Sequence, residues 1–128
     1  MVAFSYSMLP AKYLIPADLK RSTIRCRNLK KEDQIERIGV LQHYWHQRSS
    51  DCELLGVRNV KKLTIIERPI LEFIARAPPE VIYCEGFGSD RYAMENFFVS
   101  NHGQRIHAEG QFYMVEWYPE RNGEAVHQ

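Results

Sequence analysis

The chain has 128 residues, 45% of them hydrophobic and 26% charged, a balance typical of a globular domain with room for one hydrophobic core. Its 17 basic and 16 acidic residues nearly cancel, which excludes a uniformly charged protein but not a local charged surface. No apolar run approaches the roughly 18 residues needed to cross a bilayer, so we expect no membrane partner.

Two strands are predicted near the N-terminus. Residues 2–8 alternate large apolar with small side chains, which is the period of a half-buried strand. Two prolines predict a loop or short edge segment over 9–20. Residues 21–27 alternate again and predict a second strand with a basic outer face. Its outward-facing residues would be Arg21, Thr23, Arg25 and Arg27.

The middle of the chain is predicted to hold two amphipathic helices. Apolar residues at steps of three and four predict a helix over 31–48, although Gly39 weakens it. Residues 49–60 are polar and irregular, and 62–67 alternate weakly as a strand. A second helix over 69–77 begins at a proline, presents one apolar face and ends at a Pro-Pro pair.

The last third is predicted to be mainly β-structure. Residues 81–84 are typical of a buried strand, followed by a glycine turn and a short helix to about Asn96. An antiparallel meander then follows. Its strands would be 97–100, 105–109 and 111–118.

These elements together predict the fold class. We expect residues 1–128 to form a single compact α+β domain, with a largely antiparallel sheet of five or six strands and two or three helices. The polar segment 119–128 is expected to fray.

The cysteine pattern favours a cytoplasmic location. Cys26, Cys52 and Cys84 are an odd, widely spaced set without a Cys-x-x-Cys pair, whereas small secreted domains usually carry an even and denser set. The N-terminus does not resemble a secretory signal, and no Asn-x-Ser/Thr glycosylation motif is present.

Charge is distributed unevenly along the chain. Residues 1–62 hold 12 basic and six acidic side chains, whereas the remainder hold five basic and ten acidic ones. The cluster that we single out is Arg21, Arg25, Arg27, Lys30 and Lys31. Such a strand face is suited to phosphate or to an acidic protein surface, but a solvated edge is often basic too. No nucleic-acid-binding motif accompanies it.

The last predicted strand carries more aromatic residues than one face can bury. Phe112 and Tyr113 cannot both point inward, and neither can Trp117 and Tyr118. One set is either an exposed interface or is covered by helices or a second sheet and forms core.

Two histidine pairs and one glycine loop are weaker candidates for chemistry. His43 and His46 resemble half of a metal site, but their spacing fits no standard zinc module. His102 and His107 flank a predicted turn beside carboxylates, which suits either acid–base catalysis or a solvated hairpin. The loop 85–91 could hold an anion, but a tight turn with glycines at positive φ is favoured.

The leading hypothesis is a small non-enzymatic binding protein. It would act as an inhibitor, adaptor or regulator through its basic strand face and aromatic sheet, with a protein partner or a second copy of itself. Nucleic-acid binding through residues 20–31 is the alternative, and a small enzyme or metal protein using a histidine pair is the second. We expect no cofactor, and we assign no catalytic residue.

Overall fold

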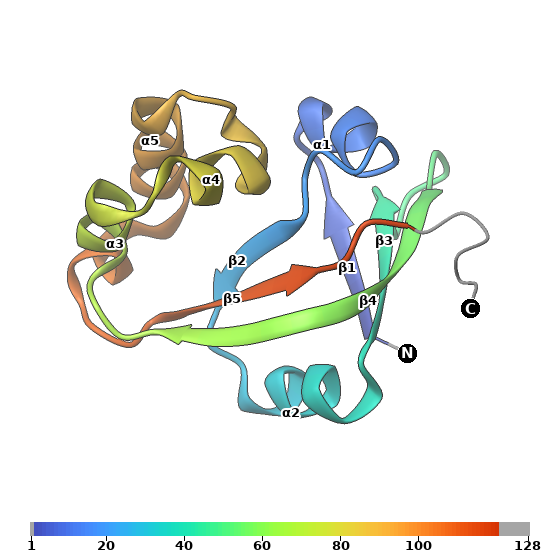
Figure 1. Ribbon diagram of the computed structural model, residues 1–128, viewed down its shortest axis with the longest axis horizontal. Helices are drawn as coiled ribbons and strands as arrows, with labels where there is room; N and C mark the ends of the chain where they lie inside the picture. Colours follow the sequence, from blue (N-terminus) through green and yellow to red (C-terminus); the bar gives the residue numbers. More distant parts are fainter. Residues whose placement is uncertain (1, 121–128) are drawn as a thin grey trace.

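The computed structural model describes residues 2–120, which form an α+β domain around a curled five-stranded sheet (Figure 1). The strands are β1 (Val2–Tyr6), β2 (Ser22–Cys26), β3 (Val40–Trp45), β4 (Glu53–Ile66) and β5 (Phe112–Trp117). Their order in the sheet is β1-β3-β4-β5-β2, with β1 parallel to β3 and every other pair antiparallel. The predicted fold class, a largely antiparallel α+β domain, is therefore confirmed.

Five helices and two short helical turns surround the sheet in the described residues. They are α1 (Leu9–Leu14), α2 (Leu29–Ile38), α3 (Ile70–Arg76), α4 (Pro79–Ile82), η1 (Tyr83–Phe87), α5 (Arg91–His102) and η2 (Gly103–His107). Helices α3, α4 and α5 form a group on one side of the molecule, while α1 and α2 lie near opposite ends of β1 (Figure 1). None of the helices between residues 2 and 120 has the length and hydrophobicity to span a membrane.

The long strand β4 makes the sheet curl. Its first half pairs with β3 and its second half with β5, and the register shifts between Val60 and Lys62 where it changes partner. The curl brings the two edge strands, β1 and β2, close to each other. Arg25 on β2 donates to the backbone oxygen of Ser5 on β1 at 3.2 Å. Lys31 on α2 likewise donates to the backbone oxygen of Ala3 at 2.7 Å.

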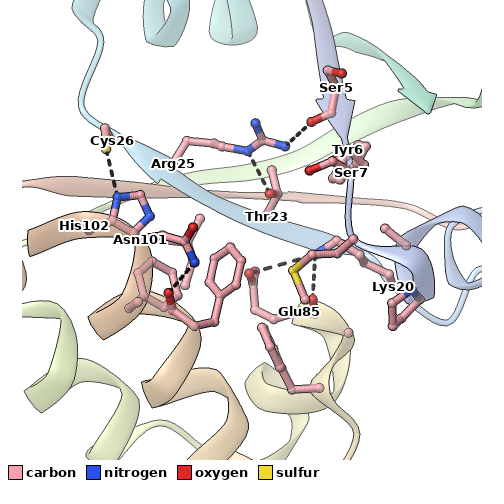
Figure 2. Close-up of a pocket in the computed structure, with 18 residues that line it drawn as sticks. Ser5, Tyr6, Ser7, Lys20, Thr23, Arg25, Cys26, Glu85, Asn101 and His102 are labelled. Atoms are coloured by element: carbon pink, nitrogen blue, oxygen red, sulfur yellow. Dashed lines mark hydrogen bonds and ion pairs between the residues drawn. The ribbon is translucent and has the colours of Figure 1, made fainter. Parts of the chain in front are cut away.

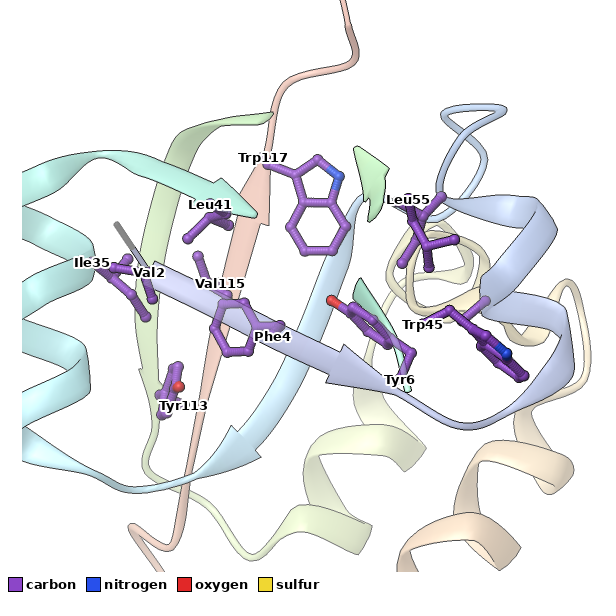
Figure 3. Close-up of a cluster of buried hydrophobic side chains, with 12 residues drawn as sticks. Val2, Phe4, Tyr6, Ile35, Leu41, Trp45, Leu55, Tyr113, Val115 and Trp117 are labelled. Carbon is purple, nitrogen blue, oxygen red and sulfur yellow. The ribbon is translucent and has the colours of Figure 1, made fainter. Parts of the chain in front are cut away.

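Strand β5 has a hydrophobic core on each of its faces. Tyr113, Val115 and Trp117 face the cluster inside the curled sheet (Figure 3). Phe112 and Met114 face a second cluster that packs under α3 and α5. Of the two alternatives, the one in which helices cover the second aromatic face of this strand is therefore correct. β5 carries aromatic residues on both faces because each face packs against its own core.

The predicted helix over 31–48 is wrong beyond Ile38. Gly39 adopts a left-handed conformation, with φ of 72°, and its N–H donates to the Ile35 carbonyl, which ends α2. Strand β3 begins at the next residue. The supposedly irregular segment 49–60 is also corrected, since β4 begins at Glu53.

Four further expectations are wrong because helices replace the predicted strands and loop. Residues 81–84 are helical rather than extended, 97–100 continue α5, and 105–107 belong to η2. Asp90 caps α5 by accepting from the N–H of Ala93, and Met94 and Phe98, four residues apart, are both buried. The segment 9–20 contains α1 rather than only a loop.

The strands predicted at 2–8, 21–27 and 111–118 and the helix at 69–77 are confirmed within a few residues. The tail predicted to fray at 119–128 falls mostly outside the described residues. Its described part is anchored, because the backbone N–H of Glu120 donates to the Asp18 carboxylate at 3.2 Å.

Candidate functional site

A cavity of about 730 Å³ opens along the free edge of β2 (Figure 2). Its walls come from the end of β1, the start of α1, β2, η1 and the C-terminal half of α5. Among the strands of residues 2–120, β2 pairs with β5 alone, so backbone groups on its other edge face this space. A cavity of this size with convergent polar groups is the usual form of a ligand site.

A buried charged pair forms one side of the cavity. Lys20 Nζ donates to the backbone oxygens of Ser22 at 2.7 Å and of Glu85 at 2.6 Å, and lies 4.0 Å from Glu85 Oε1. The Ser22 hydroxyl donates to the Glu85 carboxylate. Lys20 and Glu85 are 7% and 5% exposed, so water contributes little to either charge.

The geometry leaves Lys20 one unused direction. Burial lowers the pKa of Lys20, and the nearby Glu85 carboxylate opposes that effect. The neutral amine has two N–H groups, which its two carbonyl contacts use, so its lone pair occupies the remaining tetrahedral position. The site can therefore hold either an ammonium paired with Glu85 or an amine that accepts a proton.

Arg25 forms the wall between the two edge strands. Its Nε donates to the Thr23 hydroxyl at 3.1 Å, and its guanidinium lies 5.0 Å from the ring centres of Phe4 and Tyr6. These contacts fix a cation beside the cavity, as Figure 2 shows. Burial raises the pKa of Tyr6 well above its usual value, with Arg25 acting in the opposite direction. Tyr6 therefore stays a neutral phenol.

The wall on the α5 side is aromatic and carries a thiol–imidazole contact. Phe97, Phe98 and His102 line it. The His102 ring stacks on Phe98 at a centroid distance of 5.2 Å, and its Nδ1 lies 3.6 Å from Cys26 Sγ. Burial lowers the pKa of His102, and Arg105 and Arg25 lower it further, so the ring is neutral at pH 7.

The five predicted basic residues do not form one surface. Arg25 lines the cavity, Lys31 binds the edge of β1, and Arg27 pairs with Glu32 at 2.9 Å. Lys30 is exposed. Arg21 lies 3.9 Å from Cys84 Sγ and lines a second, smaller cavity of about 270 Å³.

Most of the predicted aromatic interaction residues are inside the protein. Phe112, Tyr113 and Trp117 are at most 2% exposed and belong to the two cores, so a partner could reach them only if the fold opened. Burial raises the pKa of Tyr113 to about 12. Tyr118 remains exposed.

The predicted histidine pairs are also separated. His43 is fully buried, and its Nδ1 forms a hydrogen bond with the Tyr6 hydroxyl at 2.9 Å. His46 pairs with Asp51 at the surface. His102 lines the cavity, but His107 is exposed in η2. Between residues 2 and 120, no three His, Cys, Asp or Glu side chains gather as metal ligands would.

Sequence reasoning missed the Lys20–Glu85 pair. The two residues are 65 positions apart, and no motif connects them. The loop containing Glu85 was predicted as a tight turn, which is confirmed by the φ of 101° at Gly86. A glutamate between an apolar run and a glycine turn is the one local signal of this site, and it does not indicate a lysine partner.

No protein-family model, curated protein or solved structure matches this chain.

Proposed function

We propose that this chain binds single-stranded nucleic acid, with one nucleotide seated in the cavity along β2. The observation that carries the proposal is that a free strand edge, the Arg25 guanidinium and an aromatic wall border the same 730 Å³ space. Proteins that bind single strands combine basic side chains for the backbone with aromatic rings for the bases.

Each part of the cavity has a matching group on a nucleotide. Arg25 uses two of its five N–H donors on Thr23 and Ser5, which leaves others for a phosphate or a base edge. Phe97 offers a ring for base stacking, and the edge of β2 offers backbone groups for a base's hydrogen-bonding edge. Lys20 adds a further cation when it is protonated.

The protein-partner hypothesis, in which the chain is an inhibitor, adaptor or regulator, stays a proposal with less support. Of the four aromatic residues that this hypothesis named, Phe112, Tyr113 and Trp117 are buried, so only Tyr118 of that set is available to a partner or a second copy.

Fluorescence anisotropy with a labelled 12-nucleotide RNA of mixed sequence tests the nucleic-acid proposal. We expect binding whose affinity falls with salt, with a log–log slope of about −0.7 for each phosphate contacted. Phe97→Ala and Arg25→Gln should each weaken it by about tenfold, since one stacked base contributes about 1–3 kcal/mol.

Arg37→Gln is the matched control, because Arg37 is exposed on α2 and pairs only with Asp33 in the same helix. Equal losses in Arg37→Gln and Arg25→Gln would contradict a role for the cavity. Absence of binding at low salt would overturn the proposal, and equal affinity for duplex RNA would overturn its single-strand part.

A second candidate function is catalysis by Lys20 on a ligand in the cavity. It is favoured by one specific observation, the lowered pKa of a buried amine whose two N–H groups are already bonded to carbonyls. An amine of this kind can accept a proton or attack an acyl carbon.

Acetylation by p-nitrophenyl acetate tests whether Lys20 is a nucleophilic amine, the property that this candidate requires. The wild type should release p-nitrophenol faster than Lys20→Met, and mass analysis should place the acetyl group on Lys20. Lys62→Met, which changes an exposed lysine on β4, should behave as the wild type. Equal rates in Lys20→Met and the wild type would eliminate Lys20 as the reacting group.

A further inference from the structure

One pair of reactive side chains at the cavity has no part in the proposed binding or in the Lys20 chemistry. Cys26 comes from the edge strand β2 and His102 from the end of α5, 76 positions later, and their Sγ and Nδ1 atoms lie 3.6 Å apart (Figure 2). Both side chains line the 730 Å³ cavity. A nucleophile within hydrogen-bonding reach of a base is the arrangement that activates a thiol.

The histidine is held in place as a base must be. Its ring stacks on Phe98 at an interplanar angle of 28° and meets the edges of Phe97 and Phe112. Three aromatic contacts from α5 and β5 therefore fix the direction of Nδ1 toward the sulfur. With its proton on Nε2, the neutral ring accepts the thiol proton at Nδ1.

Two arginines lie near the pair. Arg25 from β2 and Arg105 from η2 both act on His102, and Tyr113 from β5 stays a neutral phenol beside Cys26. Reactive cysteines occur in partly exposed, electropositive surroundings of this kind. Cys52, by contrast, is exposed at the surface.

We propose that Cys26 is a covalent modification site for α,β-unsaturated carbonyl compounds that enter the cavity. The thiol proton moves to His102 Nδ1, the sulfur forms a bond to the β-carbon, and the electrons of the carbon–carbon double bond move to the α-carbon. The α-carbon then takes a proton from His102, so that nothing is oxidised and no group leaves. The resulting thioether occupies the cavity. The expectation that this adduct blocks the nucleotide site rests on the proposed function.

Competitive labelling with N-ethylmaleimide tests the site by comparing the three cysteines within one molecule. At substoichiometric reagent and pH 7, peptide mass analysis should find Cys26 labelled at least about three times faster than Cys52, although Cys52 is more exposed. The reason is that His102 Nδ1, 3.6 Å from Cys26 Sγ, can take the thiol proton as the sulfur reacts. Slower labelling of Cys26 than of Cys52 would overturn the proposal.

His102→Gln separates base catalysis from simple accessibility. In this variant Cys26 should lose its advantage, while the rates of Cys52 and Cys84 stay unchanged. Because an unfolded variant would expose all three thiols and raise their rates together, these two cysteines report on folding in the same sample. An unchanged Cys26 rate, with Cys52 and Cys84 also unchanged, would contradict the role of His102.

The effect on the cavity is measured separately, with the RNA probe and the Cys52→Ser/Cys84→Ser double variant. Labelling of its one remaining cysteine should weaken RNA binding at least tenfold if the adduct fills the nucleotide site. Selective labelling without any effect on measurable RNA binding would show that the thiol is reactive but lies outside that site. If the unlabelled protein does not bind RNA, the proposed function fails while the labelling rates still decide whether Cys26 is a reactive thiol.

Discussion

The buried Lys20–Glu85 pair allows a sharp test, because each partner can be replaced by a neutral side chain of similar size. Lys20→Met removes the donor to two backbone carbonyls and leaves the Glu85 carboxylate buried without its cation. Glu85→Gln keeps those two hydrogen bonds and an acceptor for Ser22, but leaves Lys20 without its counter-charge. The double variant removes both charges.

The expected magnitudes follow from these contacts. Breaking a buried ion pair from one side costs about 3–5 kcal/mol, so Lys20→Met should lower the free energy of unfolding by about 4 kcal/mol at pH 7. Glu85→Gln should cost less, about 2 kcal/mol, because the carbonyl contacts of Lys20 survive. The double variant should be about 2 kcal/mol more stable than the sum of the single losses predicts, since no unpaired charge remains.

Urea denaturation of the four proteins at pH 7 measures this cycle, with Lys62→Met as a surface control that should change stability by less than about 0.5 kcal/mol. Strictly additive losses in the double variant would refute the coupling between the two charges.

Three further predictions concern other parts of the fold. Arg58 is 3% exposed and bonds to Asp18, Glu120 and the Ile15 carbonyl, so it ties the segment after β5 to β4. Arg58→Met should lower the free energy of unfolding by about 3–5 kcal/mol in urea denaturation, and a loss below about 1 kcal/mol would contradict this. Burial lowers the pKa of His43 from 6.5 to about 3. Below pH 7 the unfolded chain therefore binds a proton that the folded chain does not, and the free energy of unfolding should fall by roughly 2 kcal/mol between pH 7 and pH 5. His43→Gln should abolish this loss, whereas the control His46→Gln should not. Gly39→Ala should cost about 1–2 kcal/mol at its left-handed φ of 72°, and Gly39→Asn less; equal thermal midpoints for all three proteins would argue against strain there.

The sequence predicted those elements whose periodicity and tertiary surroundings agree. Alternation placed β1, β2 and β5, and a one-sided apolar face between prolines placed α3. The sequence pattern predicted the wrong element at residues 81–84 and 97–100, where consecutive apolar residues are equally compatible with a strand and a helix. In the structure, Ile82 and Phe98 point into the same core from helices, which period alone does not decide.

The candidate site was less predictable than the fold. Arg25 was identified from the charge cluster, but its cavity exists only because the sheet curls and α5 packs across β2. Cys26 and His102 were each noticed separately, and the partners Lys20 and Glu85 meet across 65 positions. Contacts between residues so far apart in the sequence have no local sequence signal.

The central claim is that the cavity along β2 is where this protein binds its ligand. Backbone amide NMR of the full chain, titrated with the unlabelled 12-nucleotide RNA, tests it most directly. We predict that the largest shift changes fall on residues 5–7, 23–26, 85–87, 97–98 and 101–102, which line the cavity. Saturable changes concentrated instead on the exposed face of α2, or no saturable changes at low salt, would contradict the claim.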